Sequence, residues 1–326
     1  MPITIGGDDI MKVLDYVKSK LPYFILAMMI LGLINGYLND VGYLKKLVTP
    51  TLFLMIYPMM INLKVTDLFN GFKNPKPLIL SVVINFLISP IIAFGLSKVF
   101  FKNSPMLMVG LILISLIPTS GMTASWTGLA NGNMKTALVM ISGNLLLSIL
   151  IIPLYMKLFL GEVVTINTIS IINSLLKVVI IPLILGDLTR RLIIKISGEK
   201  RYRELKPNFG SISSLGVLFI VFIAMSLKSK TIISKSELVL YSLIPLVIYY
   251  AVLLLISHVV GEKILDKKNR ISLVYGTTMR NLTVALGLSL AAFGGSLAVF
   301  LIAIGYIIQV PLAAFYMQLV KKQALN

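Results

Sequence analysis

Long apolar stretches follow one another along almost the whole of this 326-residue chain, and they constrain its fold more than any other feature. The hydrocarbon core of a bilayer is roughly 30 Å thick, so a helix needs about 20 mostly apolar residues to cross it. Apolar residues make up 57% of the chain and charged residues 13%. The longest polar intervals, residues 1–21 and 190–208, are too short to bury a core of their own. The sequence therefore predicts an all-α polytopic membrane protein.

About ten transmembrane helices are predicted. They cover residues 22–38, 47–63, 77–99, 106–130, 134–160, 167–189, 209–228, 237–260, 270–292 and 296–320. Two of these helices carry proline, glycine, hydroxyl or charged residues at their centre, at residues 118–123 in the fourth and at residues 276–281 in the ninth. We expect both helices to be broken within the membrane.

The net charge of +18 is distributed as in a membrane protein. If both termini lie on one side of the membrane, that side carries 20 of the lysines and arginines and the opposite side carries 8. Positive residues accumulate in cytoplasmic loops, so both termini are predicted to be cytoplasmic, with the chain in the plasma or inner membrane of the cell. The same rule accounts for the net charge of +18, so the sequence predicts no nucleic-acid partner. No cleavable signal peptide is visible.

The two halves of the chain resemble one another. Met122 precedes Pro153 by 31 residues, and Met279 precedes Pro311 by 32 residues, in corresponding predicted helices. Five helices per repeat, an odd number, place the two repeats in opposite orientations. We therefore predict two inverted five-helix repeats, residues 1–163 and 164–326, which is an architecture typical of secondary transporters.

The two breaks are where we expect the chemistry. Unsatisfied backbone in lipid costs several kcal/mol per group, so a break survives where protein or a water-filled cavity receives the freed groups. In inverted-repeat transporters, broken helices cross near the midplane and present half-helix ends to substrate and ions. The residues expected to line the site are Thr119, Ser120, Thr123, Ser125, Trp126 and Thr127 in the first half and Thr277, Thr278, Arg280, Asn281 and Thr283 in the second.

Several of these residues have an alternative role. Serine and threonine in membrane helices often hydrogen-bond to the carbonyl one turn back, and Trp126, the only tryptophan, can equally be a packing residue. Asn85, Asn144 and Gln309 are amides inside predicted helices, where bonding between helices is their usual role. Asn144 and Gln309 are retained as candidates for substrate contact.

The remaining two basic residues, Lys177 and Arg280, fall inside predicted helices, and Arg280 lies at the expected break of the ninth. A guanidinium there costs at least about 2.5–3.5 kcal/mol, and such residues are functional by default. Asp187 lies beside Arg190 and Arg191 near a helix end, and the other acidic residues lie in predicted loops, so no carboxylate is a fixed partner. We expect Arg280 to bind an anion; the alternative is a structural bridge to the carbonyls of the broken helices.

The residues that enzymes and metal sites use are missing from the predicted membrane region. The absence of cysteine excludes disulfides, cysteine-ligated zinc, iron–sulfur clusters and a thiol nucleophile. His258 is the only histidine, and no pair of carboxylates lies inside the predicted helices. We expect no enzymatic activity, no metal site and no cofactor.

With breaks in the fourth and ninth helices and Met279-Arg280-Asn281 before an apolar helix, the sequence resembles the bile acid:sodium symporter superfamily, which includes the arsenical-resistance permeases. The resemblance implies two domains with substrate bound between them. Helices 1, 2, 6 and 7 would form a panel domain, and helices 3–5 and 8–10 would form a core domain.

The departures from the family pattern bear on coupling. Sodium-coupled members of the family resemble one another in two patterns. These are Glu-x-Gly-x-Gln-Asn in the ninth helix and Ala-Ser-Asn in the fourth. Here Gly276 replaces the glutamate, Arg280 the glutamine and Trp126 the asparagine, while Ala124, Ser125 and Asn281 remain. A guanidinium supplies no oxygen to a sodium ion, so we expect the usual sodium sites to be lost or degraded.

The arsenical-resistance branch resembles this chain in general character, but its better-known permeases share a fourth-helix cysteine and a tenth-helix Glu-Val-Pro. This chain has no cysteine, and it has Gln309-Val310-Pro311 where those permeases have Glu-Val-Pro. The sequence predicts a secondary transporter that moves a small organic or inorganic anion by alternating access. An arsenite or oxyanion permease and a channel are the alternatives.

Overall fold

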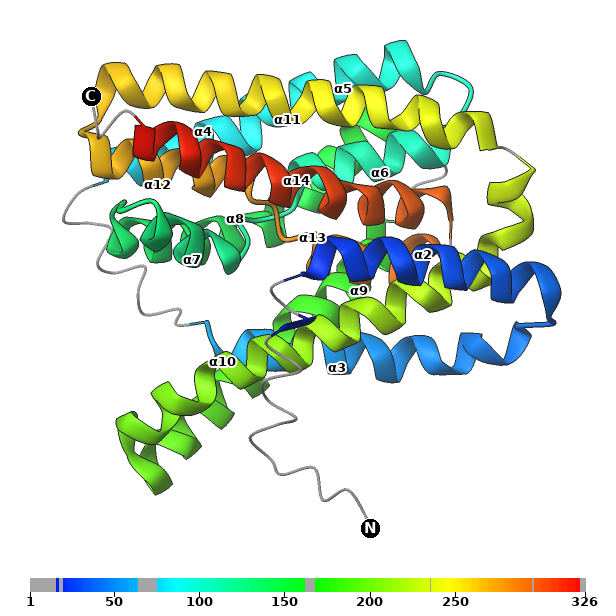
Figure 1. Ribbon diagram of the computed structural model, residues 1–326, viewed down its shortest axis with the longest axis horizontal. Helices are drawn as coiled ribbons and strands as arrows, with labels where there is room; N and C mark the ends of the chain where they lie inside the picture. The colour runs from blue at the N-terminus through cyan, green and yellow to red at the C-terminus, as the bar shows by residue number, and fades with distance from the viewer. Residues whose placement is uncertain are drawn as a thin grey trace. The chain divides into compact units, whose positions relative to one another are not determined.

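The computed structural model describes residues 16–17, 20–63, 75–161, 168–234, 236–294 and 296–322. Within these ranges the protein consists of helices, and no strand is present (Figure 1). The predicted all-α fold is confirmed.

The first half of the chain contains helices that end close to the predicted limits. They are α2 (Leu21–Leu38), η1 (Gly42–Leu47), α3 (Val48–Ile61), α4 (Lys76–Val83), η3 (Ile84–Ile88), α5 (Ser89–Phe100), α6 (Pro105–Leu116), α7 (Met122–Leu129) and α8 (Met134–Leu160). The segment η3 is a π-helical turn, so α4, η3 and α5 form one continuous helix. Pro90 lacks the N–H that would bond four residues back into this turn, which accounts for the wider turn here.

The second half contains α-helices that range from 8 to 53 residues in length, with a π-helical turn among them. They are α9 (Thr168–Leu175), η4 (Leu176–Ile180), α10 (Ile181–Ile233), α11 (Ser236–Ile264), α12 (Lys267–Thr278), α13 (Leu282–Phe293) and α14 (Leu297–Lys322). The segment η4 is again a π-helical turn followed by a proline, Pro182, and joins α9 to α10 without interruption.

Seven helices of the described chain are long and apolar enough to cross a membrane. The fourth and ninth predicted helices do not qualify because each is divided into two short ones, and the sixth and seventh are joined in one run, Ile171–Ile233. The protein is therefore a multi-pass membrane protein. The total of ten crossings and the inverted repeat stay predictions, and the repeat boundary at residues 163 and 164 lies outside the described residues.

The chain divides into two compact units, each built from both halves of the sequence. Unit 1 combines Met1–Leu63 with Asn173–Ser234, and unit 2 combines Lys64–Ile172 with Lys235–Asn326. Unit 1 thus holds α2, α3 and α10, and unit 2 holds α4 to α8 and α11 to α14.

In unit 1, α10 reverses its direction at Gly198. This glycine has a φ of 82°, a conformation that side chains other than glycine rarely adopt. Before the reversal, Arg190 Nη1 donates to the carbonyl of Leu63 at 2.7 Å, and after it Tyr202 Oη donates to the carbonyl of Ile61 at 3.2 Å. Both arms of α10 therefore contact the end of α3. The polar interval 190–208 was expected to separate two helices, but it is helical on both sides of Gly198.

The backbones of α2 and α10 approach each other closely within unit 1. A Cβ placed on Gly36 would lie 1.9 Å from the carbonyl oxygen of Ser226. Beside this contact, Asn35 Nδ2 donates to Ser226 Oγ at 3.2 Å. Small residues with polar bonds beside them are the usual means by which helices associate in lipid, where apolar burial gives little driving force.

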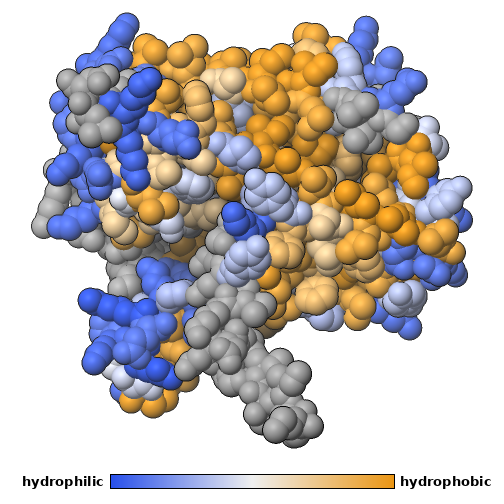
Figure 2. Space-filling view, viewed as in Figure 1, coloured by the Kyte–Doolittle hydropathy of each residue, from blue (hydrophilic) through white to orange (hydrophobic). Residues whose placement is uncertain are grey.

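In unit 2, the outward face of α11 is apolar along its length, as Figures 1 and 2 show for the face turned to the viewer, with hydrophilic side chains at both ends. The exposed apolar residues there include Ile244, Val247 and Leu255, which are 49%, 51% and 60% exposed. By contrast, α6 and α13 are buried over most of their length. This arrangement places α6 and α13, one half of each broken helix, in the interior of unit 2.

Candidate functional site

The first break lies between α6 and α7. Pro118 disfavours helical backbone in the residue before it, and Ile117 is accordingly extended, with φ −66° and ψ 143°. Helix α7 starts again at Met122, where the Ser120 hydroxyl accepts a hydrogen bond from the backbone N–H at 3.2 Å. The predicted break at 118–123 is found, shifted to residues 117–121.

The second break is shorter than the predicted range 276–281. Gly276, Thr277 and Thr278 still belong to α12, so only residues 279–281 lie between the helices. Asn281 then caps α13, because its Oδ1 accepts from the N–H of Val284 at 3.2 Å. Asparagine is among the favoured residues at this capping position, which accounts for the restart at Leu282.

The two breaks meet. Ser120 N donates to the carbonyl of Met279 at 2.7 Å, and Asn281 N donates to the carbonyl of Pro118 at 2.9 Å. Thr119 and Arg280 lie opposite each other in an isolated antiparallel bridge. Each break thus satisfies backbone groups that the other leaves free, which is the condition for non-helical backbone at membrane depth.

Arg280 is 1% exposed and lies at this crossing. Its Nη2 donates to Ser89 Oγ at 2.7 Å, and its Nη1 donates to the carbonyl of Ile117 at 3.4 Å. Its Nε has no hydrogen-bond partner in the described part of the protein. Within that same part, no carboxylate forms an ion pair with Arg280. Neutral oxygens therefore hold the guanidinium, and its positive charge is uncompensated.

Gln309 fixes the backbone of Arg280 rather than its side chain. Gln309 Oε1 accepts from the N–H of Arg280 at 2.8 Å, and Gln309 Nε2 donates to the carbonyl of Arg280 at 3.1 Å. Tyr250 Oη donates to the same Oε1 at 3.1 Å. The amide therefore adds to the two backbone bonds of Arg280, from its N–H to the Thr278 carbonyl at 3.1 Å and from the Leu282 N–H to its carbonyl at 2.9 Å, neither of which is an α-helical bond.

A group of polar residues receives the free carbonyls at the end of α12. Thr119 Oγ1 donates to the carbonyl of Gly276 at 2.6 Å, and Asn85 Nδ2 donates to the same oxygen at 3.1 Å. Asn144 Nδ2 donates to Thr119 Oγ1 at 2.8 Å, and Thr123 Oγ1 donates to the carbonyl of Tyr275 at 3.2 Å. The Oδ1 atoms of Asn85 and Asn144 have no partner in the described part, so both can accept from a ligand or water.

The other predicted threonines do not hydrogen-bond to the Arg280 guanidinium, whose bonds in the described part go to Ser89 and Ile117. Thr277 and Thr278 are buried, and their hydroxyls donate to carbonyls one turn back in α12 at 3.0 and 2.6 Å. This is the alternative role described above for threonines in membrane helices. Thr283 Oγ1 is 2.8 Å from Tyr306 Oη, and Thr127 is fully buried.

Ser125 and Trp126 lie on the outer part of α7. Ser125 is exposed, and Trp126 is half-buried, with its ring stacked on Tyr275 at a centroid distance of 6.3 Å. Trp126 therefore has a packing role, since it lies against the buried cluster that contains Tyr275 and Met279.

Two residues at the crossing were missed by the sequence interpretation. Ser89 Oγ accepts from Arg280 and lies 2.7 Å from Tyr249 Oη. The available signals were a Ser-Pro pair in the third predicted helix and a Tyr-Tyr pair, Tyr249-Tyr250, in the eighth. Both pairs are polar groups inside long apolar segments, where such groups usually have a specific partner.

Known proteins with related sequences include arsenical-resistance proteins and probable sodium/metabolite cotransporters. The chain is 24% identical to the arsenical-resistance protein Acr3 of Corynebacterium glutamicum, over 91% of this chain and 87% of that protein. It is 25% identical to the probable sodium/metabolite cotransporter BASS6 of Arabidopsis thaliana, over 85% of this chain and 68% of the relative. A third relative, the uncharacterized protein YbaS of Bacillus subtilis, is 25% identical over 90% of this chain and 92% of its own length.

The family match covers α3 and α10 of unit 1 and α4 to α8 of unit 2, whereas α2 lies outside it. Residues 49–235, more than half of the chain, match the sodium bile acid symporter family. The predicted resemblance is confirmed, and the chain belongs to the sodium bile acid symporter family.

Proposed function

We propose that this protein is a secondary transporter that moves a small organic or inorganic anion across the membrane by alternating access. Membership of a symporter family supports transport as the general activity. The negative charge of the substrate is inferred from Arg280, which is the single observation that carries the proposal.

A buried positive charge without a negative partner is costly, because removal from water is not offset by an ion pair. The Ser89 hydroxyl and the Ile117 carbonyl supply only partial negative charge to Arg280. An anion bound at the crossing would complete the compensation, with the free Nε as an additional donor. Because all contacts of Arg280 lie in unit 2, this part of the site moves with that unit.

The division into two units supports the same mechanism. We propose that unit 1 is the panel domain and unit 2 the core domain of the family architecture. Alternating access would then move one unit relative to the other while the crossing of the two breaks stays intact.

The experiment is a ligand titration of purified protein. A thermal-shift screen against small metabolite and inorganic anions identifies a ligand, since a compound that binds only the folded state raises its stability. Arg280→Gln should then weaken binding by about 1.5–3 kcal/mol, the scale of a charge-assisted hydrogen bond, which is roughly tenfold to over a hundredfold. Arg280→Lys should restore binding only in part, because an ammonium keeps the charge and loses the planar fork.

The matched control is Arg203→Gln, which removes an arginine whose side chain is 75% exposed. It should leave affinity unchanged. If Arg280 only ties the broken helices together, Arg280→Gln lowers the unfolding temperature while correctly folded protein keeps its affinity. Equal affinities for wild type and both Arg280 variants would remove Arg280 from the binding site.

An arsenite or oxyanion permease is the second candidate. The likeness to two arsenical-resistance Acr3 proteins favours it, at 24% identity for that of Corynebacterium glutamicum and 26% for that of Alkaliphilus metalliredigens. Because the chain has no cysteine, recognition would have to use charge and hydrogen bonds rather than thiolates. Including arsenite and arsenate in the anion screen tests this candidate directly.

A channel is the remaining alternative. Counterflow in liposomes distinguishes it from a carrier, since a carrier exchanges labelled for unlabelled substrate with saturation. Single-channel currents would instead support a pore.

A further inference from the structure

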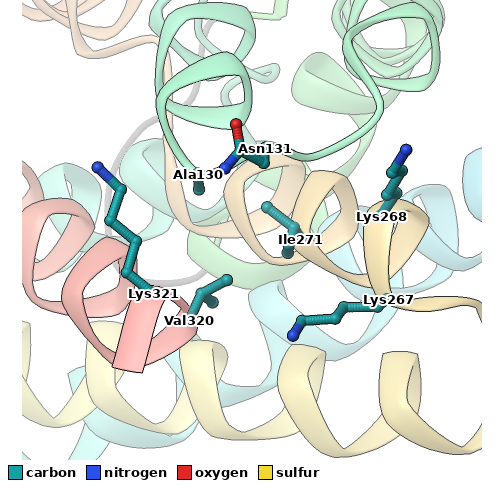
Figure 3. A pocket seen from close by; sticks show the side chains of 7 residues that line it. All are labelled: Ala130, Asn131, Lys267, Lys268, Ile271, Val320 and Lys321. Atoms are coloured by element: carbon teal, nitrogen blue, oxygen red, sulfur yellow. The ribbon is translucent and has the colours of Figure 1, made fainter. Parts of the chain in front are cut away.

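A cleft of about 450 Å³ lies in unit 2 and is lined by residues other than those that hold Arg280 (Figure 3). It is formed where the end of α7, the start of α12 and the end of α14 come together. The residues that line it are Ala130, Asn131, Lys267, Lys268, Ile271, Val320 and Lys321.

Three of the lining residues are lysines. Lys267 and Lys268 lie at one side of the cleft, and Lys321 lies at the other (Figure 3). All three are exposed, and none forms an ion pair with an acidic residue of the described chain. The neighbouring Asp266 uses its carboxylate to accept hydrogen bonds from Lys268 N, Asn269 N and Asn269 Nδ2. The rim of the cleft therefore carries three positive charges without compensation.

The base of the cleft is apolar. Ala130, Ile271 and Val320 are 2%, 2% and 3% exposed, and Figure 3 shows them between the two groups of lysines. A hydrated inorganic anion would gain nothing from such a base. An amphiphile would use both parts, with its negative group at the lysines and its hydrocarbon on the apolar side chains.

The cleft lies at the ends of membrane-spanning helices. Lys267 starts α12 three residues after the end of α11, and Lys321 lies in the last turn of α14. Helix ends of this kind lie at the level of the lipid headgroups. Basic pockets between helices at that level are where anionic headgroups bind.

We propose that this cleft binds an anionic phospholipid, with the phosphate at Lys267, Lys268 and Lys321 and part of the glycerol and acyl region against Ala130, Ile271 and Val320. Charge complementarity and the apolar base select this occupant. The proposal does not depend on the nature of the transported solute.

The base of the cleft is continuous with the interior at the second break. Ala130, Ile271 and Val320 belong to one buried cluster that also contains Tyr275 and Met279. A lipid seated on this cluster would hold the end of α7 and the start of α12 together. We therefore expect bound lipid to stabilise the folded protein rather than merely to coat it.

The test uses the full chain, purified and delipidated in detergent. Phosphatidylglycerol or phosphatidylcholine in mixed micelles is titrated while the unfolding temperature is recorded. Phosphatidylglycerol should stabilise the wild type at lower concentration than phosphatidylcholine. The triple variant Lys267→Gln, Lys268→Gln, Lys321→Gln should raise the concentration of phosphatidylglycerol needed for half of the effect by at least about tenfold.

A second triple variant has the same net charge and leaves the cleft intact. Lys195→Gln, Lys200→Gln, Lys322→Gln removes three lysines that do not line the cleft, and it should retain the wild-type preference. A matching loss in this control, or equal effects of the two lipids on the wild type, would overturn the proposal.

A further arm identifies the source of the anion. Inorganic phosphate and glycerol 3-phosphate, titrated in the same way, should give no stabilisation that depends on the three cleft lysines. If they do, the site takes a free phosphate and the lipid proposal is wrong. The single variant Lys321→Glu provides an independent check should the triple variant fold poorly, and it too should weaken the effect of phosphatidylglycerol.

Discussion

The side chain of Gln309 brackets the peptide of Arg280, accepting from its N–H at 2.8 Å and donating to its carbonyl at 3.1 Å. One amide thus replaces the two backbone hydrogen bonds that a helix would have supplied at this position. The arginine that carries the proposed substrate charge is consequently held by its main chain, which leaves its guanidinium free for other contacts.

Replacing Gln309 by leucine should therefore destabilise the protein. The change removes the two Gln309 bonds to the buried N–H and carbonyl of Arg280. These groups keep only the bonds to the Thr278 carbonyl at 3.1 Å and from the Leu282 N–H at 2.9 Å, and each lost hydrogen bond costs about 0.5–1.5 kcal/mol. Gln318→Leu, at an exposed position of the same helix, is the matched control and should be close to neutral. Unfolding temperatures of the two variants in one detergent give the comparison, and similar values would show that the bracket is dispensable.

Ligand binding should not require sodium. The sodium-coupled pattern of the family has an oxygen-bearing side chain at three positions where this chain has Gly276, Arg280 and Trp126. The measurement is the affinity of an identified ligand in sodium and in choline buffers. A sodium dependence of tenfold or more would contradict the expectation. In that case Asn85 and Asn144, whose buried Oδ1 atoms have no partner in the described part, are the first residues to replace.

Gly36→Ala should destabilise unit 1, because the new Cβ would meet the carbonyl oxygen of Ser226, a backbone atom that cannot move aside alone. Overpacking of this kind typically costs about 1–3 kcal/mol. Gly95→Ala in α5 is the control. Its Cβ would meet nothing within 4 Å, and alanine is favoured over glycine in a helix, so stability should stay equal or rise slightly. Thermal unfolding of both variants tests the contrast, which would fail if Gly36→Ala were neutral.

Asp266 should contribute to the loss of stability in acid. Burial raises the pKa of its carboxyl, but hydrogen bonds from Asn269 and from the N–H of Lys268 outweigh burial and lower the pKa below the ordinary value of 3.8. A pKa that is lower in the folded state stabilises the fold above the unfolded value, and this contribution disappears as the pH falls through the folded pKa.

The variant Asp266→Asn isolates this contribution, since asparagine can still cap α12 and does not titrate. Unfolding temperatures of both proteins are measured from pH 7 down to pH 3. The wild type should lose more stability than the variant below about pH 4. Parallel curves would show that the cap does not depend on the charge.

The helices and the position of the breaks could be predicted because their signals are local. Pro118 ends α6 through its own backbone restriction, and Asn281 starts α13 through its own side chain. The extent of the second break was predicted wrongly because Gly276 was taken as a helix end. Its carbonyl instead accepts from Thr119 and Asn85, so α12 continues for two more residues.

The partners at the crossing could not be predicted because they come from distant parts of the chain. Ser89 lies 191 residues from Arg280 in sequence, and only the packing of α5 within unit 2 brings their side chains together. Gly198 is a comparable case in unit 1. Charged residues on both sides suggested a loop, whereas contacts of both arms with the end of α3 stabilise a helical reversal.

The meeting of the two breaks has a consequence for biosynthesis. Thr119 and the Gly276 carbonyl that it binds are 157 residues apart, so the first break emerges long before its partner is made. At a synthesis rate of about 5–20 residues per second, the delay is roughly ten to thirty seconds. During that time the exposed backbone of residues 117–121 has to be kept hydrated or covered by the insertion machinery. Release of the nascent chain before α12 arrives would leave unsatisfied carbonyls and N–H groups in lipid, a state open to quality-control proteolysis.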